Sequence, residues 1–238
     1  MSSRPELKLA WCSYEAAKYA CERWHYSSSM PAGKAVRLGV WEGGVYIGVV
    51  VFARGASDAI GKPYGLAQTE VCELARVALR DHVVPVSRIL AVALQQLVKT
   101  QPGLRLVVSY ADPAVGHHGG IYQATNWYYV GDTQPDYAII DRAGKRWHSR
   151  MVSATGYKRS FGDRIRAIRP DQGTRVNLPG KHKYLYPLDA DMRERIKPLA
   201  KPYPKRASEV GYSPSKGEAA VRHRPGRSSK SAKLAQST

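Results

Sequence analysis

The spacing of apolar residues divides the first half of the chain into segments with helical and strand patterns. Residues 13–24 carry apolar side chains at helical spacing and begin with a serine suited to an N-cap, so we predict a helix there. The apolar segments 36–42 and 45–53 flank the pair Gly43 and Gly44. Two glycines between two apolar segments are the strongest hairpin signal in the chain.

The next segments continue this mixture of strand and helix patterns. Residues 69–79 alternate apolar and polar positions as a strand does, and residues 81–100 then change to the helical period, with Pro85 near the start. Further short apolar segments predict strands at 104–110, 127–131 and 136–141. This order predicts an α/β fold, with a mixed central sheet flanked by helices.

Basic charge is concentrated in the second part of the chain. The 238 residues have a formal net charge of +18. Residues 1–141 hold 13 Lys and Arg against 12 Asp and Glu, whereas residues 142–238 hold 24 against 7. A regional excess favours a polyanion as partner, although a solvated basic tail without a fixed partner is the alternative. The 15 Tyr and 5 Trp suit the stacking of bases.

Several classes of protein are excluded. The cysteines Cys12, Cys21 and Cys72 are widely spaced and odd in number, which argues against a disulfide framework or a cysteine zinc site and fits a reducing cytoplasm. No apolar segment approaches the roughly 20 residues that span a bilayer, so we expect a soluble cytoplasmic protein. The motifs of P-loop kinases, dinucleotide oxidoreductases, zincins and α/β-hydrolases are absent from the sequence.

The segment SYADPAVGHHGGIYQATNWYYVG, residues 109–131, is the most crowded candidate for a site. It follows an apolar strand, and ligands gather where such strands end. Turn chemistry is an adequate account of Asp112 before proline, but it does not explain His117, His118 and Tyr122. Side chains of adjacent histidines diverge, so we expect only one of the two to face the site and leave open which.

Polar residues at three other places could join that site. His25, in the loop after the first helix, is followed by Tyr26. Glu73 and Arg76 lie on the strand 69–79, where an ion pair is the alternative interpretation. Ser87 stands near the start of the helix 81–100, where an ordinary N-cap is the alternative.

Two segments of the basic part have patterns typical of nucleic-acid contacts. His148-Ser149-Arg150 forms a polar cluster, and KHKYLYPL, residues 181–188, interleaves basic with aromatic side chains. Lys and Arg neutralise phosphates while Tyr stacks on exposed bases. An edge strand with polar side chains for solubility is the alternative for residues 181–188.

Taken together, HYSSSMP, CELARVAL, PVSRIL, the long block 109–131 and HSR resemble the phage Mom family of DNA-modification proteins. The similarity covers roughly residues 20 to 190. The family is similar to GNAT acyltransferases, and it converts adenine in phage DNA to N6-carbamoylmethyladenine, which protects the DNA from host restriction. The resemblance implies a GNAT-like catalytic domain over residues 1–170, with residues 171–200 as a basic C-terminal segment of that domain. Pro, Ser, Lys and Arg dominate residues 201–238, which predicts a disordered basic tail.

The resemblance also implies a site, an acyl-CoA donor such as acetyl-CoA, and iron. One departure is that the segment RDHVVPVSR lacks the glycines with which GNAT loops hold the CoA pyrophosphate. By role, the predicted residues are catalytic His25, Arg76, Asp112 and Tyr122; cofactor-binding Val77, Ser87 and Arg88; iron-binding His25, Asp112 and Tyr122; and nucleic-acid-binding Tyr26, His117, Trp127, Arg150, Lys181, Lys183 and Tyr184.

These predictions combine into one hypothesis for the reaction. The enzyme flips adenine out of double-stranded DNA, Tyr122, Trp127 and Tyr128 sandwich the base, and Asp112 accepts a proton from its amine. Simple acyl transfer gives an amide, whereas carbamoylmethyl is attached through CH₂, so a further step, donor or metal is implied. The alternatives are a basic DNA-binding protein without activity and a GNAT enzyme acting on protein or small amines.

Overall fold

The structure, a computed structural model, describes residues 5–55, 57–160 and 162–205. The strands are β1 (Leu7–Trp11), β2 (Ala35–Glu42), β3 (Val45–Ala53), β4 (Val71–Leu79), β5 (Leu106–Ala111), β6 (Tyr128–Asp132), β7 (Asp136–Asp141), β8 (Arg146–His148), β9 (Tyr157–Ser160), β10 (Asp163–Arg166), β11 (Gly173–Leu178) and β12 (His182–Pro187). The α-helices are α1 (Tyr14–Trp24), α2 (Val86–Thr100), α3 (Gly120–Gln123) and α4 (Ala190–Ile196). In the described ranges, every helix is too short or too polar to cross a bilayer.

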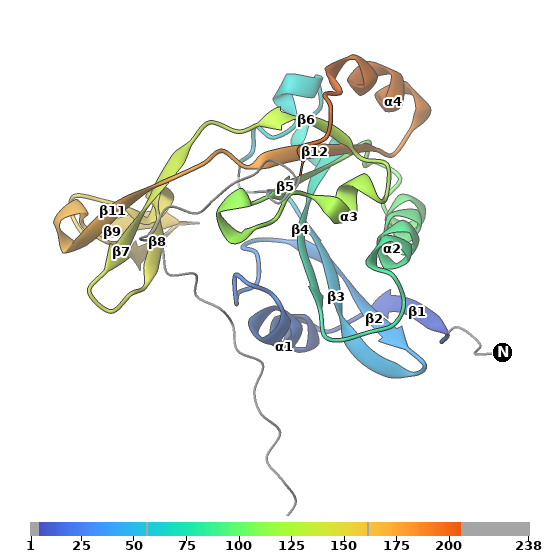
Figure 1. Cartoon of the computed structure of the whole chain (residues 1–238), viewed down its shortest axis with the longest axis horizontal. Coiled ribbons are helices and arrows are strands. Elements are labelled where there is room, and N and C mark those ends of the chain that lie inside the picture. The colour runs from blue at the N-terminus through green and yellow to red at the C-terminus, as the bar shows by residue number, and fades with distance from the viewer. Residues whose placement is uncertain (1–4, 56, 161, 206–238) are drawn as a thin grey trace, which may run out of the picture. The chain divides into compact units, whose positions relative to one another are not determined.

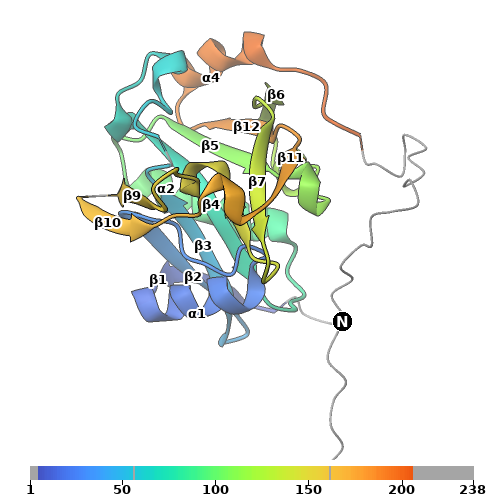
Figure 2. The same ribbon diagram turned by 90° about the vertical axis from the view of Figure 1, so that its left-hand side faces the viewer.

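The centre of the fold is a mixed sheet with the strand order β1-β2-β3-β4-β5-β12-β6 (Figure 1). The pair β4 and β5 is parallel, and the other neighbours are antiparallel. Helices α2 and α1 cover opposite faces of this sheet, and α4 packs on the side of α1 at the other end (Figure 2). This arrangement confirms the predicted α/β fold with a mixed central sheet flanked by helices.

The parallel strands β4 and β5 separate partway along their length. They pair only from Val71 to Glu73 and from Leu106 to Val108. One residue further along β4, the register against β3 shifts, and Ala75 is the extra residue of this bulge. Because a bulge bends a strand and re-aims its side chains, the sheet opens between β4 and β5 at this point. The opening lies at the carboxyl ends of the two strands, where the sequence predicts a site.

The local helix signals are partly confirmed. Ser13 caps α1 as predicted, since its Oγ accepts from the Ala16 amide at 3.1 Å. Helix α2 begins only at Val86, with Pro85 at the cap position and no side-chain cap, so the N-cap interpretation of Ser87 is wrong. The apolar face of α2 is nevertheless as its period predicts, because it buries Ile89, Leu90, Ala93, Leu94 and Leu97.

The segment 181–188 lies inside the sheet, so its interpretation as an edge strand is wrong. Strand β12 pairs with β5 on one side and β6 on the other. The residues up to Pro204 form one unit. Strand β12, which follows residue 170, lies between β5 and β6 and therefore belongs to the same sheet as the strands before residue 170. The expected disordered tail falls almost wholly on 206–238, outside the described residues.

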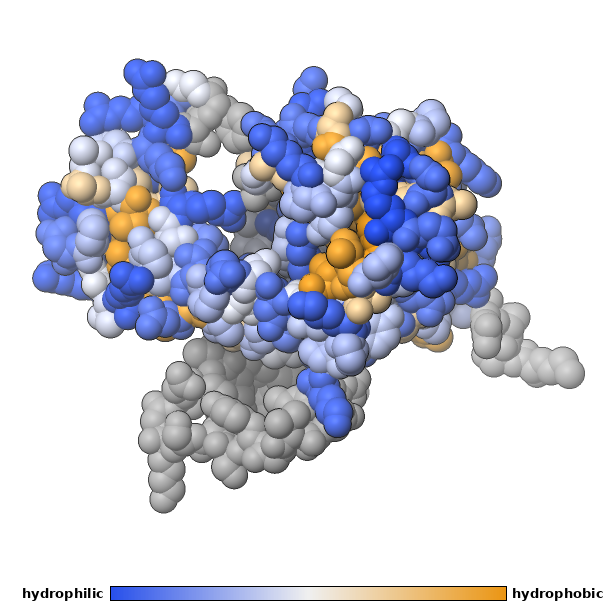
Figure 3. All heavy atoms as spheres, turned by 90° about the horizontal axis from the view of Figure 1, so that it is seen from above, coloured by the Kyte–Doolittle hydropathy of each residue, from blue (hydrophilic) through white to orange (hydrophobic). Residues whose placement is uncertain are grey.

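Residues 133–180, which we call the insert, lie between β6 and β12. They contain the three-stranded sheet β11-β7-β8 and the hairpin of β9 and β10. Two hydrogen bonds between Thr133 and Lys181 close its base: the Thr133 amide donates to the Lys181 carbonyl, and the Lys181 amide donates to Thr133 Oγ1, each at 2.9 Å. The insert contains ten Lys and Arg residues but only four Asp and Glu residues, so its formal charge is positive. Hydrophilic side chains cover most of its face in Figure 3.

Candidate functional site

Two segments that are distant in sequence meet beside the opening between β4 and β5. The ring of Tyr26, in the loop after α1, lies 4.4 Å from that of His25 and 5.1 Å from that of His117, centroid to centroid. His117 follows β5, so the HYS loop and the long block 109–131 are in contact through Tyr26 and His117.

His25 is a neutral hydrogen-bonding group at physiological pH. Burial, followed by the charges of Arg76 and His117, lowers the pKa of its imidazole to about 4. The Ser27 amide donates to His25 Nδ1 at 3.1 Å, so Nδ1 is an acceptor and the ring proton lies on Nε2. His25 can therefore donate a hydrogen bond from Nε2, but at that atom it has no lone pair for a proton or a metal.

We expect His25→Gln to reduce the loss of stability that the protein undergoes at acid pH. The unfolded chain protonates this histidine near its ordinary pKa and the folded chain only near pH 4, so the free energy of unfolding falls as pH drops through this window. Urea unfolding at pH 7 and pH 4.5 measures the difference. An equal fall in the wild type and the variant would contradict the buried, neutral state of His25.

Arg76 joins the HYS loop to the bulge of β4. Its Nε donates to the Ser29 carbonyl at 2.9 Å, and its Nη1 donates to the Ala75 carbonyl at 2.7 Å. These bonds fix the loop against the sheet and place a permanent positive charge near His25. Arg76 thus shapes the predicted site, and its catalytic assignment stays a prediction.

Asp112 is a buried carboxylate with two partners. It is 6% exposed. Its Oδ1 accepts from the Ala114 amide at 3.0 Å, and its Oδ2 lies 3.2 Å from Lys181 Nζ. The first contact is the predicted turn chemistry, since Asp112 caps the short helical turn Pro113–Val115. The ion pair ties this part of the site to the base of the insert.

The hydroxyl of Tyr122 is bonded within the sheet. Ser109 Oγ lies 2.8 Å from both the Leu74 carbonyl and the Tyr122 hydroxyl. Because a carbonyl only accepts, the Ser109 proton goes to Leu74 and the Tyr122 proton points to Ser109. Burial raises the pKa of Tyr122 to about 12, so the phenol is neutral. Ser109 thus bridges β5 to β4 where the strands separate, and Tyr122 of α3 binds to Ser109.

Most of the aromatic side chains predicted to contact nucleic acid are in the core. Trp127 and Tyr184 are 0% exposed, and Tyr122 lies between them with ring centroids 5.1 and 4.9 Å away. Burial counts against stacking on a base, because stacking needs an open ring face. Tyr26 differs from these three, since it is 54% exposed at the mouth of the site.

The residues predicted to bind iron do not fit that group. Asp112 already pairs with Lys181, the Tyr122 hydroxyl with Ser109, and His25 Nδ1 with Ser27. Within the described ranges, no three His, Cys, Asp or Glu side chains gather as a metal site would require. The donor set offers iron no group without a competing partner, and we derive no step through it.

The segment before α2, where a CoA pyrophosphate was expected, already holds an anion of the protein. The Glu42 carboxylate accepts from the Val83 amide at 3.0 and 3.1 Å and from the Val84 amide at 2.6 Å. No local sequence pattern indicates this contact, which spans about forty residues. Of the residues predicted to bind the donor, Arg88 is exposed, whereas Val77 and Ser87 are partly buried.

The remaining predicted DNA contacts lie at different depths. Arg150 is exposed, and its carbonyl accepts from Lys158 Nζ at 2.8 Å. Lys183 is partly buried, with its Nζ 5.0 Å from the centroid of the Tyr64 ring, and burial lowers its pKa. Arg150 is therefore available to a phosphate at the surface, while Lys183 belongs to the packing of β12.

Comparison with known proteins places the chain in a family. Residues 6–205 match the model of the Mom protein family. The chain belongs to this family. It is 25% identical over 207 residues to the methylcarbamoylase Mom of Escherichia phage Mu, with 84% of each chain covered. The matched range includes both the HYS loop and the long block, so the segments that meet at the site are those that carry the predicted resemblance to Mom proteins.

Two solved structures are also similar to the chain at low identity. An IAA acetyltransferase from Bacillus cereus ATCC 14579 shares 12% identity, with a TM-score of 0.41 over 76% of this chain and 99% of that one. FeeM, an N-acyl amino acid synthase from uncultured soil microbes, shares 13% identity, with a TM-score of 0.44 over 82% of this chain and 96% of that one.

Proposed function

We propose that the protein modifies adenine in double-stranded DNA, converting it to N6-carbamoylmethyladenine and thereby protecting phage DNA from host restriction. One observation carries this proposal: the exposed ring of Tyr26 packs against His117, whose amide donates to the Asp112 carbonyl at 3.1 Å, so the ring and the buried Asp112 belong to one cluster at the end of β5. Partial burial and then the Asp112 charge raise the pKa of Tyr26, while Arg76 and Arg146 oppose the rise. The name of the phage Mu relative supports the proposed group.

In this proposal the target adenine leaves the duplex before it reacts. Its amine is paired and stacked inside the helix, so extrusion must expose it. Tyr26 offers the extruded base an exposed ring, and His117 packs edge-on against that ring. His25 Nε2 donates a hydrogen bond to the base, and Asp112 accepts one from the exocyclic amine. As the C–N bond to the donor carbon forms and the bond from that carbon to its leaving group breaks, the amine proton moves toward Asp112. Partial proton transfer of this kind contributes about 10²–10⁴-fold.

The donor is proposed to be an acyl-CoA held at the first turn of α2. When bound, it would supply the acyl unit and release the CoA thiol; because this transfer alone leaves an amide, the CH₂-linked carbamoylmethyl product needs a further step. Ser87 and Arg88 would hold its phosphates, because helix N-termini and guanidinium groups favour anions. Glu42 keeps the amides of Val83 and Val84 from this role. The site thus differs from a glycine-rich loop in using side chains.

Mass spectrometry of nucleosides tests the proposed function. Plasmid DNA isolated after expression of the full chain is digested, and we expect a modified adenosine heavier by one carbamoylmethyl group. DNA from cells expressing the chain with Asp112→Asn is the matched sample. DNA binding with unmodified adenosine would favour a binding protein without activity, and modification of protein or small amines instead would favour another transferase; either result contradicts the proposal.

A further inference from the structure

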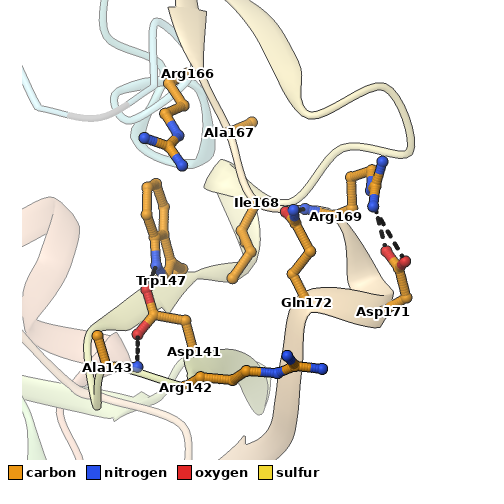
Figure 4. Close-up of a pocket in the computed structure, with 10 residues that line it drawn as sticks. All are labelled: Asp141, Arg142, Ala143, Trp147, Arg166, Ala167, Ile168, Arg169, Asp171 and Gln172. Atoms are coloured by element: carbon orange, nitrogen blue, oxygen red, sulfur yellow. Dashed lines mark hydrogen bonds and ion pairs between the residues drawn. The ribbon is translucent and has the colours of Figure 1, made fainter.

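The insert contains a hollow that the proposed adenine site does not use. It has a volume of about 480 Å³ and lies between the β7–β8 turn and the segment 166–172. This volume is within the range of about 300–1,000 Å³ that ligand sites occupy. Trp147 and Ile168 border it, with Arg166 above the indole and Arg142 along its lower side (Figure 4).

Trp147 is held in a fixed orientation at the edge of this hollow. Its Nε1 donates to Asp141 Oδ2 at 2.8 Å. Asp141 Oδ1 accepts from the amides of Ala143 and Lys145 at 3.0 and 2.9 Å, which fixes the turn on which Trp147 stands. Lys145 Nζ covers the indole 4.1 Å from its centroid but does not line the hollow. The hollow therefore meets a part of the ring that Lys145 leaves open.

Guanidinium groups at the hollow carry uncompensated charge. Arg169 pairs with Asp171 at 3.2 Å, so its charge is matched. Arg142 and Arg166 form no salt bridge with any other described residue. Both are exposed and border the same hollow as the fixed indole. A planar aromatic ring beside two available guanidinium groups suits a base and its phosphate.

Strand β8 connects this hollow with the proposed adenine site. Side chains alternate along a strand, so Arg146 and Trp147 point to opposite faces of β8. The charge of Arg146 acts on the Tyr26 hydroxyl at the adenine site. Trp147 faces the hollow from the other side of the strand. Two adjacent residues of β8 are thus directed differently: the charge of Arg146 acts on Tyr26, and Trp147 borders the hollow.

We propose that this hollow binds one unpaired nucleotide of a DNA strand, with its base against Trp147 and Ile168 and its phosphate against Arg142 and Arg166. The choice of DNA as the source rests on the proposed function, because extrusion of an adenine leaves neighbouring nucleotides unpaired. The chemistry of the hollow itself requires only an aromatic base joined to a phosphate.

Fluorescence anisotropy with the full chain tests this inference separately from activity. The probes are a labelled single-stranded oligonucleotide, the matching duplex, and adenosine monophosphate as competitor. We expect Trp147→Ala to weaken binding of the single strand about tenfold. Arg166→Gln should reduce the slope of log affinity against log salt by about one. Arg164→Gln is the control, since Arg164 lies on the same strand β10 and stacks on Tyr157 instead. Trp147→Phe, which keeps a stacking ring, should bind nearly as the wild type does.

The outcomes separate the possible occupants. If the unlabelled oligonucleotide displaces the labelled strand better than adenosine monophosphate does, the hollow binds a DNA strand, as proposed. If adenosine monophosphate displaces it better, the hollow binds a free nucleotide and the proposal is wrong. Equal losses for Arg164→Gln and Arg166→Gln, an unchanged affinity for Trp147→Ala, or displacement of the oligonucleotide by poly-glutamate would overturn the inference. If the wild type makes no adenosine adduct while these affinities change as expected, the proposed function fails and the nucleotide site stands.

Discussion

Asp112→Asn is expected to lower adenine modification at least about 100-fold, because it removes the only proposed proton acceptor for the amine. The substitution is nearly isosteric, and the side-chain oxygen still accepts from the Ala114 amide. The lost ion pair leaves Lys181 partly exposed to water, so the fold is expected to persist. Quantifying the modified nucleoside per unit of folded protein measures the effect.

The control for this variant is Asp132→Asn. Asp132 is also a hydrogen-bonded carboxylate, with its Oδ1 2.6 Å from His182 Nδ1, but it lies on β6 outside the site. We expect it to retain modification and Asp112→Asn to retain affinity for duplex DNA. Full modification by Asp112→Asn would refute the role of Asp112. If both variants lost adenine modification equally, the two carboxylates would affect modification only through the stability of the fold.

The fold brings some of the residues predicted for the site into contact, and their supporting partners come from distant segments. His25 and His117 lie in motifs that the resemblance to Mom proteins singles out, and the structure places both beside Tyr26. Lys181 and Glu42 could not be found this way, because each pairs with a residue on another strand or loop. Local sequence patterns contain no information on which strand neighbours which.

The same limit explains which parts of the fold could be predicted. The cap of α1 and the hairpin of β2 and β3 depend on neighbouring residues, and both are as expected. The position of β12 between β5 and β6 depends on pairing across about seventy residues, and its mixed basic and aromatic sequence is typical of a surface. The Tyr184 ring of β12 is buried because the insert returns the chain to the sheet centre.

Trp127→Ala is expected to destabilise the protein by about 3–5 kcal/mol, the usual cost of removing a fully buried large aromatic side chain. The Trp127 ring packs against Tyr122 and Tyr186 at centroid distances of 5.1 and 5.3 Å, and its carbonyl accepts from the Tyr203 hydroxyl at 2.7 Å. Urea unfolding measures the loss. Trp127→Phe should cost less, because the indole Nε1 has no partner among the described residues.

Tyr26→Ala is the matched comparison, because both rings were predicted to contact nucleic acid and only Tyr26 is exposed. Its free energy of unfolding should stay within about 0.5 kcal/mol of the wild type, as for other surface substitutions. Its affinity for DNA with an unpaired adenine should fall by about 1–3 kcal/mol. If Trp127→Ala kept normal stability but lost affinity for DNA, Trp127 rather than Tyr26 would be the ring that contacts DNA. A large loss of stability in Tyr26→Ala would remove the exposed ring from the adenine site.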